Sequence, residues 1–184
     1  VHIAVFRYAG RLANIVQRSD EFFINGGILA QPGDLDADIA APAMVYATIK
    51  RSDKVIFSVS ADKARTAAIL DLLGITFRKE AFRAKPHCVT LLSTMSPLGI
   101  DENALDTLLL LARHAQPLCI APGPMAGGTG PISLAGNVSL ANAEILGTNV
   151  LCQLACPGMP IIYGFAATTS DMHNMSVSNA SPGF

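Results

Sequence analysis

The stretch CVTLLSTMSPLGIDENALDTLLLLARHAQPLCIA, residues 88 to 121, holds the pattern that decides the fold. A short apolar run, 88–94, precedes the loop 95–100, and Asp101 is suited to begin a helix because its carboxylate accepts otherwise free N–H groups. A second apolar run follows at 117–121. The helix between the two runs is predicted to bury one apolar stripe, formed by Leu105, Leu108, Leu109 and Ala112. Strand, helix and strand in this order predict a parallel pair of strands with a helical crossover.

The same unit recurs before this stretch. The β-branched run VIFSV, 55–59, predicts a strand, and Ser60 is placed to cap a helix that Gly74 would end in a left-handed conformation. The remaining upstream predictions are a helix at 1–16, a strand at 22–26, and a helix near 40–51 with Pro42 in its first turn.

After residue 121 the pattern continues with a glycine-rich loop, a long helix from Ser133 to Ala155 and a strand at 160–165. Alternating strands and helices predict an α/β fold with a parallel sheet, either an open doubly wound sheet or part of an eight-stranded barrel. In both folds the ligand chemistry lies on loops that follow strands. Those loops are 59–61, 94–100, 121–133 and 165–184, within a single α/β segment spanning 1–184.

Composition excludes several classes of protein. Half of the residues are apolar (51%), only 15% are charged, and the net charge is −1 without a basic block, so disorder and nucleic-acid binding are not expected. No apolar run approaches the ~20 residues that a membrane span requires. Four cysteines in apolar surroundings predict reduced, buried thiols and a cytoplasmic protein. The start at Val1 and the end at Phe184 predict a segment of a longer polypeptide.

The loop APGPMAGGTGPISLAG, 121–136, contains five glycines and three prolines. A phosphate loop of the P-loop type needs a lysine, which this loop lacks, and the dinucleotide spacing G-x-G-x-x-G is also absent. Phosphate binding by backbone amides at the start of the next helix stays an alternative. About twelve residues without regular structure exceed the usual connection of two to six residues in such folds, and long connections are usually functional.

The segment 121–164, APGPMAGGTGPISLAGNVSLANAEILGTNVLCQLACPGMPIIYG, resembles the signature block of the trimethylamine methyltransferase superfamily. The matching motifs are a Pro-x-x-Gly-Gly-Thr-Gly-Pro loop, Leu-Ala-Gly, Leu-Ala-Asn-Ala-Glu and a strand ending in Tyr-Gly, together with the Ser96-Pro97-Leu98 loop before an acidic helix. The similarity extends from about Phe22 to the end of the chain.

This resemblance implies a (β/α)₈ TIM barrel, of which the chain would be the amino-terminal half or slightly more. It also implies transfer of a methyl group from a methylated or quaternary amine, such as trimethylamine or glycine betaine, to the cobalt of a corrinoid (cobalamin) that a partner protein presents. No directly bound cofactor or metal is expected. The trimethylamine branch of the family carries a pyrrolysine, at a position that would lie beyond Phe184.

Methyl transfer from a quaternary ammonium moves no proton, so the expected site orients and desolvates a cation rather than holding an acid–base pair. Catalytic residues are therefore not assigned. The candidate substrate-binding residues are the loop residues Gly127, Gly128 and Thr129 as hydrogen-bond donors, Tyr163 and Phe165 at a strand end, and Asp171 and His173 in the last loop.

The residues also allow a zinc-dependent methyltransferase, a non-catalytic binding module and a homo-oligomer. Cys152 and Cys156 stand four apart on a predicted helix, the spacing of two zinc ligands in a methyltransferase of thiols or methanol. A non-catalytic α/β module that binds a small ligand or a partner is the other alternative. A homo-oligomer is expected, with Asn142 and Glu144 as candidates for the contact between subunits.

Overall fold

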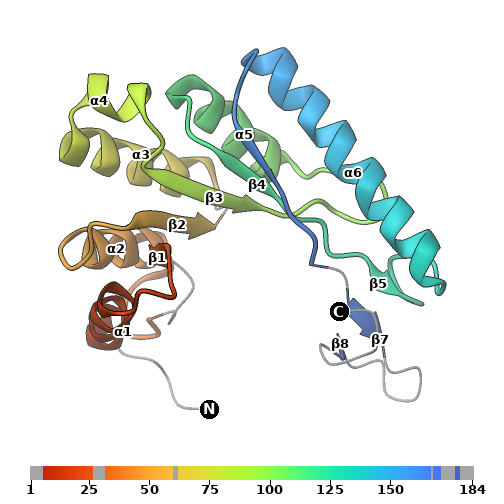
Figure 1. The fold of residues 1–184 in the computed structure, drawn as a ribbon, viewed down its shortest axis with the longest axis horizontal. Coiled ribbons are helices and arrows are strands. Elements are labelled where there is room, and N and C mark those ends of the chain that lie inside the picture. The colour runs from red at the N-terminus through yellow and green to blue at the C-terminus, as the bar shows by residue number, and fades with distance from the viewer. Residues whose placement is uncertain (1–5, 27–31, 60–61, 167, 171–176, 179–184) are drawn as a thin grey trace.

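The computed structural model describes residues 6–26, 32–59, 62–166, 168–170 and 177–178 (Figure 1). The helices are α1 (Phe6–Arg18), α2 (Ala37–Ile49), α3 (Lys63–Phe77), α4 (Lys79–Ala84), α5 (Glu102–His114) and α6 (Leu134–Ala155). The strands are β1 (Ile24–Gly26), β2 (Val55–Val59), β3 (Cys88–Leu92), β4 (Leu118–Ile120), β5 (Met125–Ala126), β6 (Ile161–Tyr163), β7 (Thr168–Ser170) and β8 (Val177–Ser178).

Five parallel strands form the main sheet in the order β1-β2-β3-β4-β6. This order follows the chain without the reversal that marks a doubly wound sheet, and it is the strand order of a (β/α)₈ barrel. Figure 1 shows the helices along the outer side of the sheet, and each packs on the next: α1 on α2, α2 on α3, α3 on α5, and α5 on α6. The predicted α/β fold with a parallel sheet is therefore confirmed.

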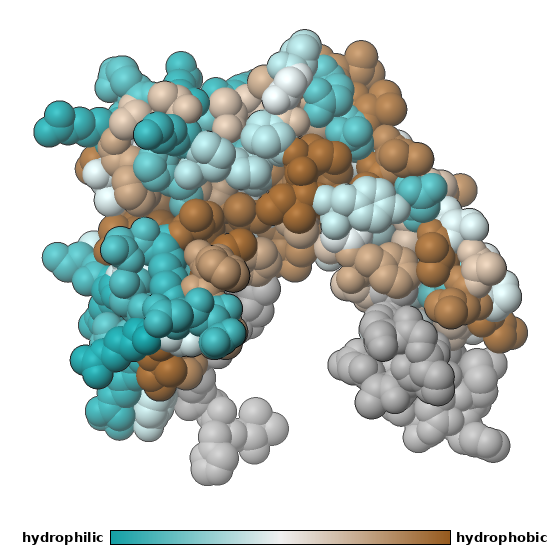
Figure 2. Space-filling view, viewed as in Figure 1, coloured by the Kyte–Doolittle hydropathy of each residue, from teal (hydrophilic) through white to brown (hydrophobic). Residues whose placement is uncertain are grey.

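Alternation along the strands divides the sheet into two unlike faces. The register places Ile56 beside Cys88, and these side chains point toward the helices and are buried in the main core. The opposite face is apolar but open: Val59 and Ile162 are 37% and 41% exposed. Figure 2 shows apolar side chains gathered in the middle of this view, over the sheet. Within the described part of the chain, the helices therefore lie against one face of the sheet.

Two predicted helix starts are capped by side chains, as was predicted for Asp101. The Asp101 carboxylate accepts the N–H of Ala104 at 2.9 Å, and the Ser133 hydroxyl accepts the N–H of Gly136 at 3.2 Å. These contacts satisfy backbone donors that the first helical turn leaves without a partner. Both caps lie within three residues of their partners, which is why the local sequence was enough to predict where these helices start.

The predicted bounds of α3 are wrong at both ends. The N-cap is Asp62 rather than Ser60, which lies outside the described residues, and Gly74 is buried inside the helix instead of ending it. The helix continues to Phe77 because this ring stacks on His87, with ring centroids 4.1 Å apart. A positive φ of 63° falls instead at Arg78, and α4 begins directly after it.

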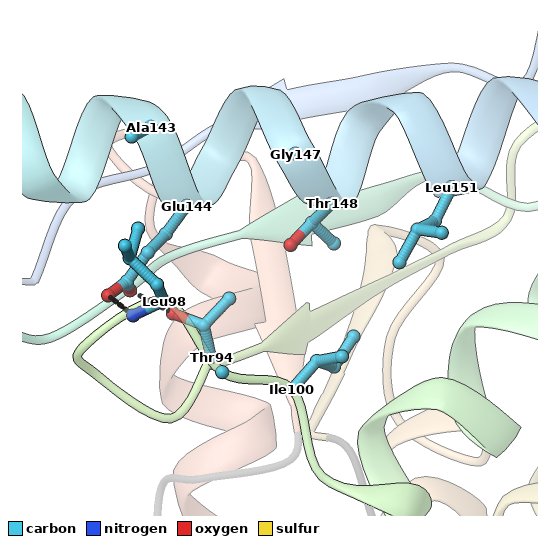
Figure 3. Close-up of a pocket in the computed structure, with 9 residues that line it drawn as sticks. Thr94, Leu98, Ile100, Ala143, Glu144, Gly147, Thr148 and Leu151 are labelled. Carbon is cyan, nitrogen blue, oxygen red and sulfur yellow. Dashed lines mark hydrogen bonds between the residues drawn. The ribbon is translucent and has the colours of Figure 1, made fainter.

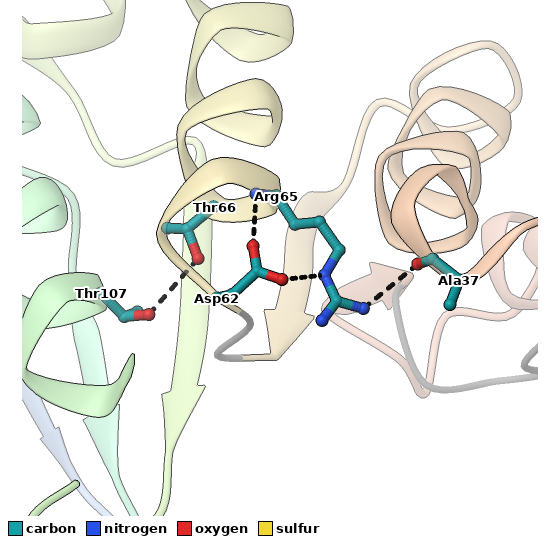
Figure 4. A network of polar contacts seen from close by, with 5 residues as sticks. All are labelled: Ala37, Asp62, Arg65, Thr66 and Thr107. Atoms are coloured by element: carbon teal, nitrogen blue, oxygen red, sulfur yellow. Dashed lines mark hydrogen bonds and ion pairs between the residues drawn. The ribbon is translucent and has the colours of Figure 1, made fainter. Parts of the chain in front are cut away.

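Asp62 and Arg65 join α3 to the helix before it (Figure 4). Asp62 accepts the backbone N–H of Arg65 at 2.9 Å and its side-chain Nε–H at 2.7 Å. The same guanidinium donates to the Ala37 carbonyl at the start of α2 at 3.1 Å. On the other side of α3, the hydroxyls of Thr66 and Thr107 lie 3.3 Å apart and connect it to α5.

Two further predictions about helices need correction. Pro42 lies in the second turn of α2, not the first, because this helix already begins at Ala37. In α5 the exposed fractions of Leu105 and Leu109 exceed a third, whereas Leu108 and Ala112 are buried as predicted. The buried stripe of α5 is rotated because it faces both the sheet and α3; it consists of Ala104, Thr107, Leu108, Leu111 and Ala112.

Candidate functional site

The glycine-rich loop was expected to lack regular structure, but its first part continues the sheet. Beyond β4 and β6, Gly164 donates its N–H to the Ile120 carbonyl at 2.9 Å, and Ala166 donates to Pro122 at 3.0 Å. Pro122 and Pro124 have no N–H to return, so the pairing is one-sided here. The paired segments 120–122 and 164–166 form a two-stranded ribbon. This ribbon leads into a small second sheet in the order β5-β7-β8, which was not predicted from the sequence.

The tip of this loop is closed by its own backbone. Gly127 donates to the Gly130 carbonyl at 3.1 Å, and both Gly128 and Gly130 donate to the Met125 carbonyl at 2.9 Å. The Thr129 hydroxyl accepts the N–H of Met125 at 2.9 Å. In this conformation the N–H groups of the candidate donors Gly127 and Gly128 are used within the loop.

Asn137, in the first turn of α6, binds the glycine-rich loop. Its side-chain amide donates to the Pro124 carbonyl at 3.2 Å, and the residue is buried. Its Oδ1 atom is buried without a hydrogen-bond partner among the described residues. The sequence reasoning missed this residue, because an Asn near a helix start reads as an ordinary solvated or capping side chain.

Glu144 on α6 carries a buried carboxylate, and it was not among the predicted site residues. It lies on α6 and is 5% exposed. Its Oε2 accepts the Thr94 hydroxyl at 2.5 Å and the Ser96 hydroxyl at 2.9 Å, and its Oε1 accepts the Leu98 N–H at 2.9 Å. Glu144 therefore ties the loop after β3 to the helix after β4, rather than facing another subunit as one prediction had it.

A cavity of about 320 Å³ lies between the loop 94–100 and α6. Figure 3 shows Glu144 and Leu98 at one side of it, with Ile100 and Leu151 across from them. Apart from the Glu144 carboxylate and the hydroxyls of Thr94 and Thr148, its walls are apolar. The cavity lies beside the loop 94–100, which follows the carboxyl end of β3, and parallel α/β folds carry their ligand chemistry on such loops.

The predicted aromatic residues lie at the end of β6, and both are exposed. The Tyr163 hydroxyl donates to Oδ1 of Asn142 on α6 at 2.8 Å. Tyr163 therefore points to the helix side of the sheet, with its hydroxyl committed, and Asn142 has a partner within the chain. Phe165 lies between Gly164 and Ala166, the two residues that pair with the glycine-rich loop. Asp171 and His173 lie outside the described residues.

The cysteines do not form a metal centre in the described part of the chain, where no three His, Cys, Asp or Glu side chains gather. Burial raises the pKa of the Cys152 thiol to about 11. Burial also raises the pKa of Cys88 and of Cys119. A zinc ligand has to be a thiolate, so these environments favour the opposite protonation state. Among the described residues, no helix is both long and apolar enough to cross a membrane.

The sheet order defines a protein of the parallel α/β class, in which ligand sites typically lie at the carboxyl ends of the strands. Comparison with family models identifies the family: residues 3–182 match the model of trimethylamine methyltransferase. The chain belongs to the trimethylamine methyltransferase family. The resemblance of the segment 121–164 is thereby confirmed.

Curated relatives agree with this assignment. The chain is 37% identical over 171 residues to a glycine betaine methyltransferase of Desulfitobacterium hafniense, covering 92% of this chain and 36% of the relative. It is 39% identical over 98 residues to a proline betaine:corrinoid methyltransferase of Eubacterium limosum, covering 53% and 20% of the two chains. A trimethylamine methyltransferase of Methanosarcina barkeri is 36% identical over 104 residues, covering 56% and 21%. The chain thus spans 36% or less of the length of these relatives.

Proposed function

We propose that the chain is part of a methyltransferase that moves a methyl group from a quaternary or tertiary methylated amine to the cobalt of a corrinoid held by a partner protein. The observation that carries this proposal is the family match over residues 3–182. Relatives named for glycine betaine, proline betaine and trimethylamine support an N-methylated donor, and one relative is named as a corrinoid methyltransferase.

The chemistry asks little of acid–base groups. The methyl carbon would pass to the cobalt as the carbon–nitrogen bond breaks and its electron pair goes to nitrogen. A quaternary donor then leaves as a neutral amine, whereas a tertiary donor has to carry a proton on nitrogen to leave as one. For a quaternary donor no proton moves, so the protein's part is to hold the donor in line and to exclude water. Apolar walls, as in the cavity between the loop 94–100 and α6, are suited to the methyl groups of such a donor and to the exclusion of water from it.

We further propose that the complete domain is a (β/α)₈ barrel, of which this chain forms one side. Strands in chain order with helices on one face only support this architecture. The open apolar face of the sheet also supports it, because a barrel would enclose that face as its interior.

For the donor site we keep Gly127, Gly128, Thr129, Tyr163, Phe165, Asp171 and His173 as proposals. Their support is positional, since the glycine loop and the segment after β6 run side by side as a hydrogen-bonded ribbon. Use of the Gly127 and Gly128 amides by a betaine carboxylate would require the loop tip to open. Self-association likewise remains a prediction.

The proposal is tested by methyl transfer to cob(I)alamin, followed by absorbance, with the protein that contains this chain. Glycine betaine, proline betaine, trimethylamine and carnitine-like donors are compared, with donor-free and protein-free reactions as blanks. We expect turnover with at least one donor and stoichiometric release of the demethylated amine. Binding of a donor without turnover would favour the non-catalytic module instead. Stoichiometric zinc in the purified protein would contradict the amine assignment.

A further inference from the structure

Glu144 is an unusual choice for its position on α6. Its side chain is only 5% exposed, and an ionised carboxylate loses favourable hydration when it is buried. Within the described residues the ion pairs are Lys63–Asp106 and Arg65–Asp62, so no described cation offsets the charge of Glu144. An apolar side chain would hold a loop against α6 at lower cost. The carboxylate is therefore to be explained by the contacts that it makes.

All three donors to Glu144 come from one short loop, at Thr94, Ser96 and Leu98. The two carboxylate oxygens divide these donors, so the loop is held at three points along its length. Leu98 adopts a φ of 55°, which is unfavourable for a residue with a side chain. Its N–H bond to Glu144 helps to hold that conformation, and strain of this kind persists only where the surroundings enforce it.

The loop is also closed on itself around this contact. Met95 and Gly99 exchange backbone hydrogen bonds of 2.9 and 2.8 Å, and a Cβ at Gly99 would lie 2.8 Å from the Met95 carbonyl oxygen. The closed loop turns its apolar side chains outward: Leu98 is 71% exposed and also lines the cavity beside α6 (Figure 3). Glu144 thus fixes an apolar surface at the carboxyl edge of the sheet.

We propose that Glu144 is a positioning residue that sets the loop 94–100 as one wall of the methyl-donor site. It acts through the loop rather than by touching the reacting atoms. This inference rests on the proposed function, because only that function makes the wall a substrate contact. The strained Leu98 and the uncompensated charge are then the structural cost of a wall with a defined shape.

Glu144→Gln tests the inference, because the amide keeps the size of the side chain but cannot accept from all three donors. Ile145→Val is the matched control: it is the next residue on α6, it is buried in the main core, and it does not line the cavity. Ser96→Ala removes one hydroxyl and is a milder second variant. Hydrogen exchange of residues 94–100 and the Michaelis constants for the donor are measured on the protein that contains this chain.

We expect Glu144→Gln to speed exchange of the Leu98 amide about tenfold or more, because the loop then opens more often. We expect kcat/KM for the donor to fall about tenfold, since a small misplacement of a positioning wall is costly. Ser96→Ala should change both quantities in the same direction and by less, and Ile145→Val should change neither.

Three results would overturn the inference. They are unchanged loop exchange in Glu144→Gln, faster exchange with Michaelis constants equal to those of Ile145→Val, and kinetic losses in Ile145→Val as large as those in Glu144→Gln. A wild-type protein without methyl transfer would instead refute the proposed function, and with it the role of the wall. Exchange data would separate the two failures, because they need no substrate.

Discussion

Asn137 on α6 occupies the space where a side chain at Gly130 would lie. A Cβ built on Gly130 would lie 2.2 Å from Asn137 Oδ1 and 3.0 Å from the Pro124 Cβ. Close packing therefore requires a glycine at this position. The same Asn137 side chain binds the loop through its hydrogen bond to the Pro124 carbonyl.

Replacing Gly130 with alanine is expected to lower the free energy of unfolding by about 1–3 kcal/mol, the usual cost of overpacking. Urea unfolding at neutral pH measures this change. The control is Gly147→Ala on α6, where a Cβ meets nothing within 4 Å. There we expect a gain of about 0.5–1 kcal/mol, because alanine favours the helix over glycine. Equal losses at both positions would contradict the packing explanation.

Gln116 joins three elements at the amino-terminal edge of the sheet and is fully buried. Its Oε1 accepts the N–H of His87 at 2.9 Å, and its Nε2 donates to the Phe82 carbonyl at 2.5 Å and the His114 carbonyl at 3.2 Å. Gln116→Leu would leave buried backbone groups without partners. We expect a loss of about 2–4 kcal/mol from one or two unsatisfied groups.

Thermal and urea unfolding measure the effect of Gln116→Leu. Leu118→Met serves as a control two residues away, where a change that conserves volume should cost about 1.5 kcal/mol or less. If Gln116→Leu proved as mild as the control, the hydrogen-bonding role of Gln116 would have to be abandoned.

Lys54 caps the carboxyl end of α1 from a distant part of the chain. Its ammonium donates to the carbonyls of Val16 at 2.8 Å, of Ser19, and of Phe22 at 2.6 Å. Lys54→Met keeps most of the length but removes the donors. We expect a loss of about 1.5–3 kcal/mol, typical of hydrogen bonds to a charged group. Faster hydrogen exchange at the end of α1 should accompany it, whereas Lys50→Met, at an exposed site, should change neither quantity.

Asp62 makes the start of α3 sensitive to acid. The backbone N–H of Arg65 holds the pKa of this carboxyl below its ordinary value of 3.8. Because the folded pKa is the lower one, the stabilisation is present above pH 3.8 and is lost as pH falls through the folded pKa. We expect Asp62→Ala to be less stable than the wild type at neutral pH. The difference should shrink as the pH falls below 3.8 and the wild-type carboxyl becomes protonated.

The measurement for Asp62 is urea unfolding of both proteins between pH 2 and 7. Asp62→Asn is the informative companion, since asparagine also caps helices but does not titrate. A difference between wild type and Asp62→Ala that stays constant across this pH range would rule out the carboxylate as its source.

Local signals allowed much of the fold to be predicted, and they failed where distant contacts decide the outcome. Asp101 and Ser133 cap helices through bonds to residues three positions away, so short spacing was sufficient. Gly74 looked like a helix end, but packing of Phe77 on His87 extends α3 beyond it. The same holds for the candidate site: the glycine loop was found from its composition, but Glu144 was not.

The sequence by itself determined the alternation of strands and helices, the parallel sheet and the membership of the family, because each is written in local periodicity or in a long contiguous motif. Only the tertiary structure decided the strand order, the pairing of the glycine loop with the segment after β6, and the partners of Glu144. Those partners lie between 46 and 50 residues away along the chain. Hydrogen bonds over such separations leave no periodic trace in the sequence, and they exist only once the chain has brought the loop after β3 against α6.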